Sequence, residues 1–386
     1  MSSANAEWPQ FTEEHEMLRG QFRRFIENEL APFADEWEAA ELFPREVFTR
    51  MGELGFFGVR YKEEHGGAGG NVWHTVVLCE EYPRCLTAGL PMAMMVQSDM
   101  ATPIIAEIGT DAQIEEFLKP ALRGEKIAAL GVSEAGAGSD VAGMATTARR
   151  DGDDYVINGS KMWITNGTRA DFVTLAARTG EDRHGGISLF TFPTNTPGFS
   201  VGKPIKKMGN KCSDTAPLFF ENCRVPKRYL LGEEGHGFMH IMTNFQGERL
   251  VGGLMGASGA QFALDDTVAY VKQRHAFGRP LTGFQVTRHK IVDLQTKIDA
   301  ARCLAYHAAD MFEKLGPGAT KQISMAKLYC AEVAVEVATQ CVQMQGGMGY
   351  SDESYISRYY RDVRLLPIGG GASEVMKEIL GKLLGL

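Results

Sequence analysis

Gly131-Val132-Ser133-Glu134-Ala135-Gly136-Ala137-Gly138-Ser139-Asp140-Val141-Ala142-Gly143 continues an apolar run that begins at Ile127. A short apolar run that ends in glycines is typical of a strand entering a loop. Small residues leave the backbone N–H groups of such a loop open to an anionic or carbonyl-rich ligand. Because an ordinary turn has the same composition, the stretch alone predicts only a strand followed by a glycine-rich loop.

The chain before this stretch has a helical pattern. Thr12 is a predicted N-cap, and Glu13 and Glu14 follow it in the first turn. Apolar residues then recur on one helical face, at Leu18, Phe22, Phe25, Ile26 and Leu30. Further helical segments continue to about Leu122, so we expect an α-helical domain over residues 1–126.

From about Lys126 onwards, short apolar runs alternate with turn signals, which is typical of β-structure. We expect a hairpin from Tyr155 to Thr165, because Asn158-Gly159 suits a type I′ turn. The other predicted strands are Ile127–Val132, Asp171–Ala177, Ile187–Pro193 and Pro217–Val225. These strands predict a small β-barrel or sandwich over residues 127–236.

The pattern is helical again from Gly237 to the end, which predicts an α-helical bundle over residues 237–386. The order is therefore helices, strands, helices, a mixed α and β chain. Strands and helices do not alternate, and this argues against a Rossmann domain.

Composition excludes several classes of protein. With 386 residues, the chain is too long for one typical core. A net charge of −8 and the lack of a basic run argue against a nucleic-acid partner. The seven cysteines are scattered without metal spacing, so we expect reduced thiols and no metal site. No run reaches the ~18 apolar residues of a membrane span.

The N-terminus, Met1–Trp8, has neither a charged n-region nor an apolar h-region. We therefore expect a cytoplasmic, bacterial protein, although a trimmed organellar protein would have the same start.

Three further strings contain residues that bind ligands in some proteins and are structural in others. Trp163-Ile164-Thr165 places an indole and a hydroxyl in a predicted strand, where a core Trp is the ordinary alternative. Arg274-His275-Ala276-Phe277-Gly278, with Gln285 after it, offers a guanidinium suited to phosphate or simply a solvated Arg. Gln343–Tyr350 ends a helix in glycines, as a C-cap does.

The last string is Arg361-Asp362-Val363-Arg364-Leu365-Leu366-Pro367-Ile368-Gly369-Gly370-Gly371-Ala372-Ser373-Glu374. Together with the strings above, it resembles the acyl-CoA dehydrogenases over essentially the whole chain. In many members a Tyr-Glu pair supplies the catalytic base, and here that pair is Gly369-Gly370. Glu248-Arg249-Leu250 matches the base segment of the long-chain and isovaleryl-CoA branch, which the chain resembles most.

The resemblance implies an N-terminal α-helical domain, a middle β-barrel and a C-terminal four-helix bundle, assembled as a homotetramer (a dimer of dimers). It also implies FAD as the cofactor, with the Arg274 segment reaching the FAD of a neighbouring subunit. The residues expected at FAD are Leu130, Val132, Ser133, Trp163, Thr165, Arg274, Phe277, Gln285, Gln343, Gly346, Gly347, Ser373 and Glu374. The residues expected at the acyl-CoA are Ser139, Phe245, Arg249 and Gly369.

The implied reaction is the α,β-dehydrogenation of an acyl-CoA thioester to the trans-2-enoyl-CoA. Glu248 would remove the α-proton, and the β-hydrogen would leave as hydride to flavin N5. The backbone N–H of Gly370 would polarise the thioester carbonyl, an oxyanion-hole device that needs no side chain. The expected electron acceptor is an electron-transfer flavoprotein.

Because Gly369–Gly371 adds no side-chain bulk, we expect a long or methyl-branched acyl group, with citronellyl-CoA-like thioesters as candidates. Two alternatives stay open for the function: a flavin oxidase of the same fold that uses O₂, and a non-catalytic acyl-CoA- and flavin-binding scaffold. Two alternatives also stay open for Arg249, which either forms a salt bridge or shapes the pocket.

Overall fold

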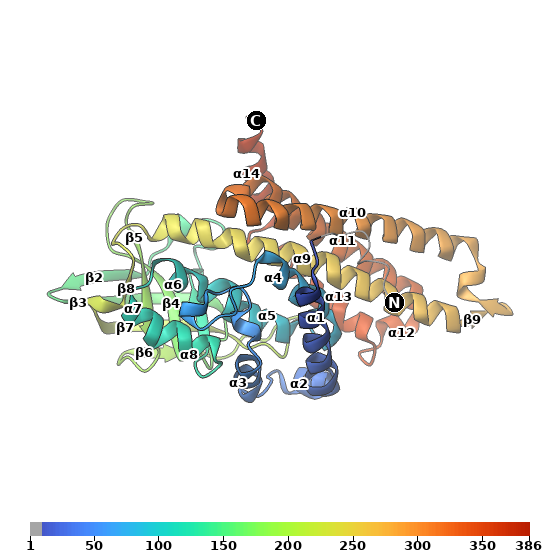
Figure 1. The fold of residues 1–386 in the computed structure, drawn as a ribbon, viewed down its shortest axis with the longest axis horizontal. Coiled ribbons are helices and arrows are strands. Elements are labelled where there is room, and N and C mark those ends of the chain that lie inside the picture. Colours follow the sequence, from blue (N-terminus) through green and yellow to red (C-terminus); the bar gives the residue numbers. More distant parts are fainter. Residues whose placement is uncertain (1–9) are drawn as a thin grey trace.

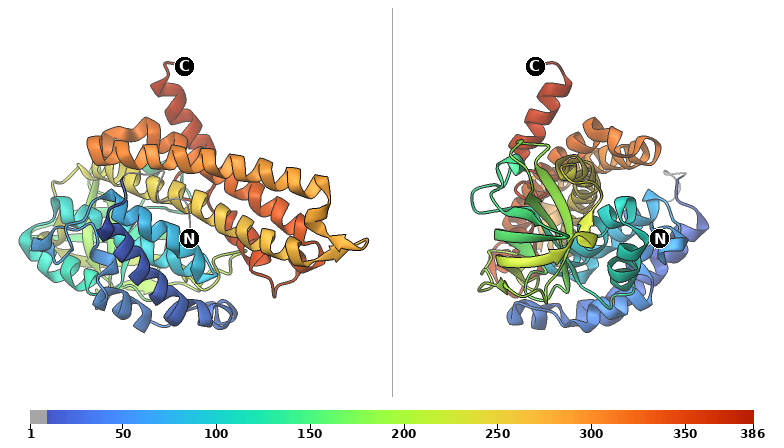
Figure 2. Two further views of the ribbon diagram at one scale, coloured as in Figure 1. Left: turned by 45° about the vertical axis from the view of Figure 1, so that its right-hand side comes forward. Right: turned by 90° about the vertical axis from the view of Figure 1, so that its left-hand side faces the viewer.

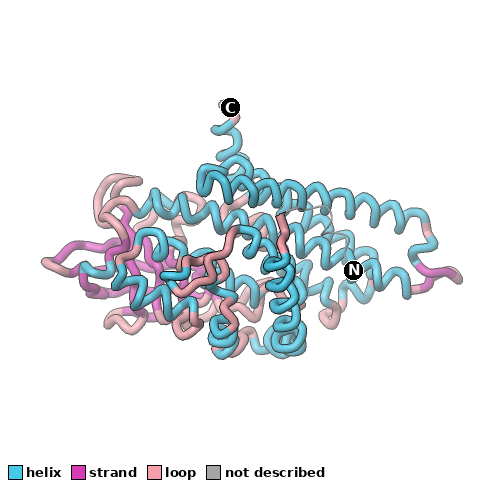
Figure 3. The backbone as a smooth tube through the Cα atoms, in the orientation of Figure 1, coloured by secondary structure: helices cyan, strands magenta, loops and turns pink. Residues whose placement is uncertain are grey.

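The computed structural model describes residues 10–386 as an elongated molecule, with most strands gathered at one end and long helices reaching to the other (Figures 1 and 3). Residues 1–9, on which the N-terminal prediction rests, lie outside the described part. The predicted order of helices, strands and helices is confirmed.

The N-terminal helices pack around aromatic side chains. Phe22, Phe25 and Ile26 are buried, as the helical spacing predicts, and the Phe22 and Phe56 rings lie 4.7 Å apart. The elements are α1 (Glu13–Phe25), η2 (Ile26–Leu30), η3 (Ala31–Phe33), α2 (Ala34–Ala40), α3 (Glu46–Glu53), η4 (Phe56–Gly58), η5 (Glu63–His65), α4 (Val72–Glu81), η6 (Tyr82–Cys85), α5 (Gly89–Met95), η7 (Val96–Ala101), α6 (Pro103–Ile108), α7 (Asp111–Gln113), η8 (Ile114–Leu118) and α8 (Lys119–Leu122).

The middle of the chain forms one twisted, 8-stranded sheet in the order β6-β7-β3-β2-β4-β5-β8, with β1 paired parallel to β4. Figure 2 shows how strongly the sheet curls. The strands are β1 (Ala128–Gly131), β2 (Thr147–Asp151), β3 (Asp154–Thr165), β4 (Phe172–Arg178), β5 (Ile187–Pro193), β6 (Phe199–Val201), β7 (Thr215–Pro226) and β8 (Leu230–Leu231).

The predicted hairpin at Asn158-Gly159 is wrong, because β3 runs unbroken through both residues. Gly159 has a φ of 142°, and a Cβ there would lie 2.7 Å from the Cα of Thr146. Glycine is therefore needed at this position for a close strand contact, not for a turn. The turn lies earlier, at residues 152–153 between Asp151 and Asp154, which pair with each other.

The C-terminal part consists of long helices, and α9 alone has 37 residues. A Cβ at Gly256 would lie 3.0 Å from the carbonyl oxygen of Cys330, so α9 and α11 approach closely. None of the helices in residues 10–386 is long and apolar enough to cross a bilayer. The elements are α9 (Gly237–Gln273), β9 (His275–Ala276), β10 (Arg279–Pro280), η11 (Leu281–Gly283), α10 (Gln285–Leu315), η12 (Gly316–Ala319), α11 (Thr320–Gln345), α12 (Gly347–Tyr350), α13 (Tyr355–Val363) and α14 (Ser373–Leu383).

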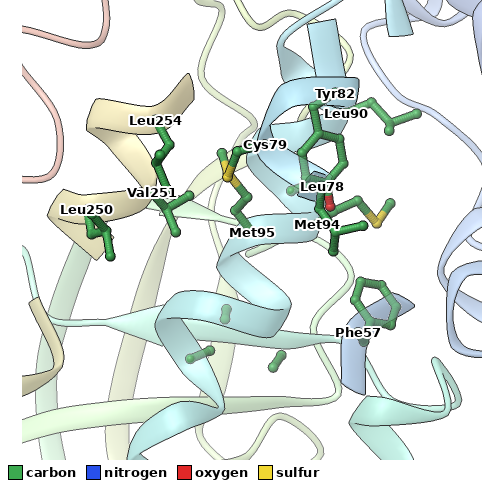
Figure 4. Close-up of a cluster of buried hydrophobic side chains, with 14 of the residues drawn as sticks. Phe57, Leu78, Cys79, Tyr82, Leu90, Met94, Met95, Leu250, Val251 and Leu254 are labelled. Carbon is green, nitrogen blue, oxygen red and sulfur yellow. The ribbon is translucent and has the colours of Figure 1, made fainter. Parts of the chain in front are cut away.

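The segment formed by α5 and η7 connects the sheet with the C-terminal helices. Asn166, directly after β3, donates through Nδ2 to the carbonyl oxygen of Ala93 at 3.0 Å. Asn244 in α9 donates through Nδ2 to the carbonyl oxygen of Met100 at 2.9 Å. Apolar side chains of the same core contribute as well: Val251 and Leu254 of α9 lie opposite Cys79 and Met95 (Figure 4). This segment thus holds the end of β3 and the first part of α9 close together.

Candidate active site

Glu248 lies in the first third of α9, with its carboxyl group covered by the C-terminal glycine loop. A Cβ added at Gly370 would lie 3.3 Å from Glu248 Oε1. Glu248 Oε2 is buried and has no hydrogen-bond partner within residues 10–386. Burial raises the pKa of Glu248 to about 7, against the opposing charges of Arg249 and Lys327. A carboxyl group with this pKa can be ionised near neutral pH and can also hold a proton, as a general base requires.

The three consecutive glycines of this loop are not equivalent. Gly370 and Gly371 have φ values of 63° and 95°, in the left-handed region that favours glycine. The nearest atom to a Cβ at Gly369 would be Leu365 Cδ1 at 3.5 Å, an ordinary contact, so a Cβ would fit there. The N–H of Gly370 donates to no acceptor in the described part of the chain. The loop therefore presents one free backbone donor next to one free carboxyl group.

Arg249 is buried beside Glu248, with 5% of its surface exposed. Its guanidinium carbon lies 5.8 Å from the centre of the Phe245 ring, and its Nε has no hydrogen-bond partner among the described residues. Burial lowers the pKa of Arg249, against the opposing charge of Glu248. Within residues 10–386, Arg249 forms no ion pair closer than 4.0 Å, so the salt-bridge alternative finds no partner there.

Lys327 in α11 completes this region, and the sequence analysis missed it. The side chain is 2% exposed, and its Nζ donates to the carbonyl oxygens of Leu366 and Gly371, at either end of the glycine loop. The next residues close the loop, since the N–H of Ser373 donates to Pro367 O at 3.1 Å. Ser373 is buried and Glu374 is exposed. The sequence does contain one signal for Lys327, since it is a lysine among the apolar residues of a helical stripe.

A row of partly accessible positions runs along α9 from the carboxyl group. Phe245, Glu248, Gly252 and Met255 are partly accessible, while most residues between them are buried. Their spacing of three, four and three residues places them on one helical face. A Cβ added at Gly252 would meet no atom within 4 Å. This row therefore forms an open wall beside Glu248.

The row ends at Met255, which lines a small cavity of about 60 Å³. Most of its walls are apolar, and they include Met92, Met95, Met255, Tyr355, Tyr359 and Leu366. Flexible methionine side chains adapt to ligands of different shape. The lining of this cavity is therefore suited to apolar groups.

A second group of predicted residues lies where β1 and β3 end. Trp163 is 59% exposed and has a φ of 65°, which is unusual for a residue other than glycine. The pairing of β3 with β7 shifts register between Lys161 and Ile164, and such bulges redirect side chains. The carbonyl of Ser133 accepts a hydrogen bond from the N–H of Met162 at 2.9 Å, which holds the glycine-rich loop beside this bulge. Around Trp163, the partly accessible positions are Leu130, Ser133 and Thr165, and Val132 is buried.

These features fit the planar ring system of FAD. A large indole left exposed at a strained position is suited to stacking on a planar ring. Cβ atoms at Gly136 and Gly138 would meet nothing within 4 Å, so the loop is open on its outer side, where Ser139 is exposed. No group of three His, Cys, Asp or Glu side chains in residues 10–386 could hold a metal ion.

A buried ion pair braces this loop. Lys161 Nζ donates to Glu134 Oε1 at 2.7 Å and to the carbonyl oxygen of Val132 at 3.1 Å. Glu134 also accepts from the backbone N–H groups of Ala145 at 2.6 Å and Thr146 at 3.0 Å. Burial acts to raise the pKa of Glu134, but Lys161 and these donors outweigh it and lower the pKa. The sequence analysis missed this ion pair. The incorrect hairpin broke the alternation of inward and outward side chains along β3, and this alternation places Lys161 inside.

A third group lies at the far tip of the helices, away from the first two. Arg274 follows α9, Phe277 lies between β9 and β10, and Gln285 begins α10 (Figure 1). Arg274 is about 39 Å from Glu248 along the helix, at ~1.5 Å per residue. Phe277 is 95% exposed and has a φ of 51°. Within one chain these residues cannot contact a ligand atom held at Glu248.

Gln343, Gly346 and Gly347 are exposed at the C-terminal end of α11, towards the same tip. Gln345 fixes this end by donating to Thr267 Oγ1 in α9 at 3.0 Å. The structure therefore gathers the predicted residues into three groups: one at Glu248, one at Trp163 and one at the tip.

Three consecutive parts of the chain match the family models of acyl-CoA dehydrogenase domains. Residues 12–125 match the N-terminal domain, residues 129–223 the middle domain and residues 235–385 the C-terminal domain. The long-chain specific acyl-CoA dehydrogenase of Rattus norvegicus is 39% identical over 96% of this chain and 86% of its own. The short-chain specific enzyme of that organism is 39% identical over 95% of this chain and 89% of its own. A solved structure of a probable acyl-CoA dehydrogenase from Mycobacterium abscessus has a TM-score of 0.94 and 42% identity, over 97% of this chain and 99% of that one.

Proposed function

The chain belongs to the acyl-CoA dehydrogenase family, whose enzymes depend on FAD and act on acyl-CoA thioesters, and on this premise we propose that Glu248 is its catalytic base. The proposed reaction is α,β-dehydrogenation to the trans-2-enoyl-CoA. One observation carries the proposal: the unpaired carboxyl group of Glu248 lies against the loop that contains the unpaired N–H of Gly370.

Each chain residue has a defined part in this reaction. Glu248 takes the α-proton, and the electron pair of the broken C–H bond becomes part of the new double bond. The N–H of Gly370 donates to the thioester carbonyl oxygen, where negative charge develops as the proton leaves. When bound, FAD supplies the acceptor for the β-hydrogen and its electron pair, as a hydride at N5. Trp163 and Thr165 would hold its ring system, and Ser133 its polar edge.

For the substrate, we propose a long or methyl-branched acyl group, citronellyl-CoA-like thioesters included. Gly252 leaves the row along α9 open one helical turn beyond Glu248, and the row continues to the cavity at Met255. Gly369 leaves room on the loop side. Sequence identity does not indicate the length of the acyl chain, because the long-chain and the short-chain specific relatives are each 39% identical to this protein.

We further propose a homotetramer, a dimer of dimers, in a bacterial cytoplasm, with an electron-transfer flavoprotein as the electron acceptor. The exposed tip with Arg274, Phe277 and Gln285 supports the tetramer, because these residues are too far from their own Glu248 to serve it. Light scattering of the FAD-loaded protein tests the assembly, and a stable monomer that retains FAD would contradict it.

Anaerobic titration of the FAD-loaded protein with straight and branched acyl-CoA thioesters tests the proposed reaction. We expect bleaching of the flavin absorbance and formation of the enoyl-CoA. Binding without bleaching would favour a non-catalytic scaffold. Rapid peroxide formation on admission of O₂ would favour an oxidase of the same fold.

A further inference from the structure

Lys327 is a buried cation without a carboxylate in contact. Its Nζ donates to the carbonyl oxygens of Leu366, at 2.8 Å, and Gly371. Within residues 10–386 no Asp or Glu oxygen lies within 4.0 Å of it. Burying an ammonium group costs free energy that two neutral carbonyls offset only in part, and an apolar side chain of similar volume would avoid that cost. Packing alone therefore does not account for a lysine here.

The two carbonyl oxygens mark the ends of the loop that covers Glu248. The loop includes three consecutive glycines, the residue type that loses most conformational freedom when it is ordered. Gly370 lies over the carboxyl group, since a Cβ there would be 3.3 Å from Glu248 Oε1. Fixing both ends of the loop therefore fixes the free N–H of Gly370 relative to Glu248.

The backbone of α11 is close enough for this arrangement. A Cβ at Gly253, in the turn of α9 after Glu248, would lie 3.3 Å from the backbone nitrogen of Lys327. The charged groups around the carboxyl group are Arg249 on α9 and Lys327 on α11, and Glu374 on α14 acts on Lys327. Burial lowers the pKa of Lys327 to about 8, with Glu248 opposing the shift, so the side chain is mostly charged at pH 7.

We propose that Lys327 is a positioning residue of the dehydrogenation, which fixes the glycine loop over Glu248 and favours the ionised carboxylate through its charge. This inference rests on the proposed function only where it refers to the base, because the anchoring of the loop can be measured without turnover.

The test compares Lys327→Met with wild type and with Lys321→Met, an exposed lysine on the same helix that serves as control. Hydrogen exchange of the amides of residues 368–373 in the FAD-loaded proteins reports the loop. We expect faster exchange in Lys327→Met only. We also expect anaerobic bleaching to slow by roughly 10–100-fold, because small misplacements of reacting groups cost about that much. Its pH midpoint should rise, because a positive charge next to Glu248 is lost.

Lys327→Gln separates anchoring from charge and covers the case in which the Met variant fails to fold. Glutamine keeps N–H donors and removes the charge, so the exchange should stay closer to wild type while the pH midpoint still rises. Wild-type exchange and an unmoved midpoint in the Met variant would overturn the proposal, and so would an unmoved midpoint in the Gln variant. If no acyl-CoA bleaches the wild-type flavin, the proposed function fails, and hydrogen exchange still decides whether Lys327 holds the loop.

Discussion

Glu134 is buried and Glu248 has one buried carboxyl oxygen, and each has a buried lysine near it; the two lysines act differently. Lys161 binds Glu134 directly at 2.7 Å, and two backbone N–H groups bind the same carboxylate. Lys327 instead binds two backbone carbonyls and leaves Glu248 without a hydrogen-bond partner at Oε2. The pKa of Glu134 is lowered, whereas burial raises the pKa of Glu248 to about 7.

The difference separates a structural carboxylate from a reactive one. Glu134 is fully satisfied, so it braces the loop after β1 and is a poor proton acceptor at neutral pH. Glu248 lacks partners, which costs stability in the folded protein and keeps the carboxyl group available for a substrate proton. Direct pairing with a lysine and two N–H groups accounts for the lowered pKa of Glu134, and burial without such partners accounts for the raised pKa of Glu248.

The largest expected effect is on catalysis, from Glu248→Gln. Glutamine keeps the size of the side chain and removes its basicity, so the rate of anaerobic bleaching should fall by ~10²–10⁴-fold, as for the loss of a general base. FAD binding should persist, because glutamine keeps the size of the side chain and Glu248 is not among the residues expected at FAD. Stopped-flow absorbance with an acyl-CoA that bleaches wild type measures the rate. Turnover at the wild-type level would show that Glu248 is not the base.

The next effect is on stability, from Lys161→Met. This change leaves Glu134 buried without its cation, and breaking a buried pair from one side typically costs ~3–5 kcal/mol. Chemical denaturation monitored by circular dichroism measures the loss. FAD content should fall as well, because Lys161 also binds the carbonyl of Val132. A variant as stable as wild type would mean that Glu134 finds other partners.

The contributions of Glu248 and Glu134 to the stability of the folded protein should change with pH in opposite directions. The pKa of Glu248 rises from 4.5 to about 7 on folding, so its contribution favours the folded state at low pH and is lost as pH rises through 7. As pH rises from 5 to 8, the Tm of Glu248→Gln should therefore increase relative to the Tm of wild type. The pKa of Glu134 is lowered on folding, so its contribution is present above its ordinary pKa and is lost as pH falls. Glu134→Gln should lower Tm at pH 7, and equal responses of the two variants would contradict the comparison.

The sequence predicts the fold well where the pattern is local. Apolar spacing identifies the first helix, and short apolar runs identify β5 over the residues that the structure gives, Ile187–Pro193. The Asn158-Gly159 prediction failed because a glycine can serve a close strand contact as well as a turn. That error also concealed Lys161, whose inward direction follows from an unbroken strand.

The site was only partly predictable for a different reason. Glu248 and Gly370 could be named through the resemblance, but their proximity depends on tertiary packing between α9 and the loop after α13. Lys327 stands out in its helix only as a lysine among apolar residues, and the pattern around Gly252 gives no reason to select it. Their roles depend on what lies opposite them, and no local pattern contains that information. The expected roles of the residues at FAD stay predictions.

The smallest expected effect on stability comes from Gly252, and it sharpens the assignment of the row along α9. Gly252→Ala should stabilise the protein by about 0.5–1 kcal/mol, because alanine favours helix and its Cβ would meet nothing within 4 Å. Gly252→Leu should place a bulky side chain on the row along α9, one turn beyond Glu248. We expect kcat/KM to fall for long and branched acyl-CoA thioesters and to change little for butyryl-CoA, in steps of ~1–3 kcal/mol for each excluded group. Gly381→Leu, at a similarly open glycine in α14, is the matched control. Equal losses for butyryl-CoA and for long chains in Gly252→Leu would show that the acyl chain does not follow this row.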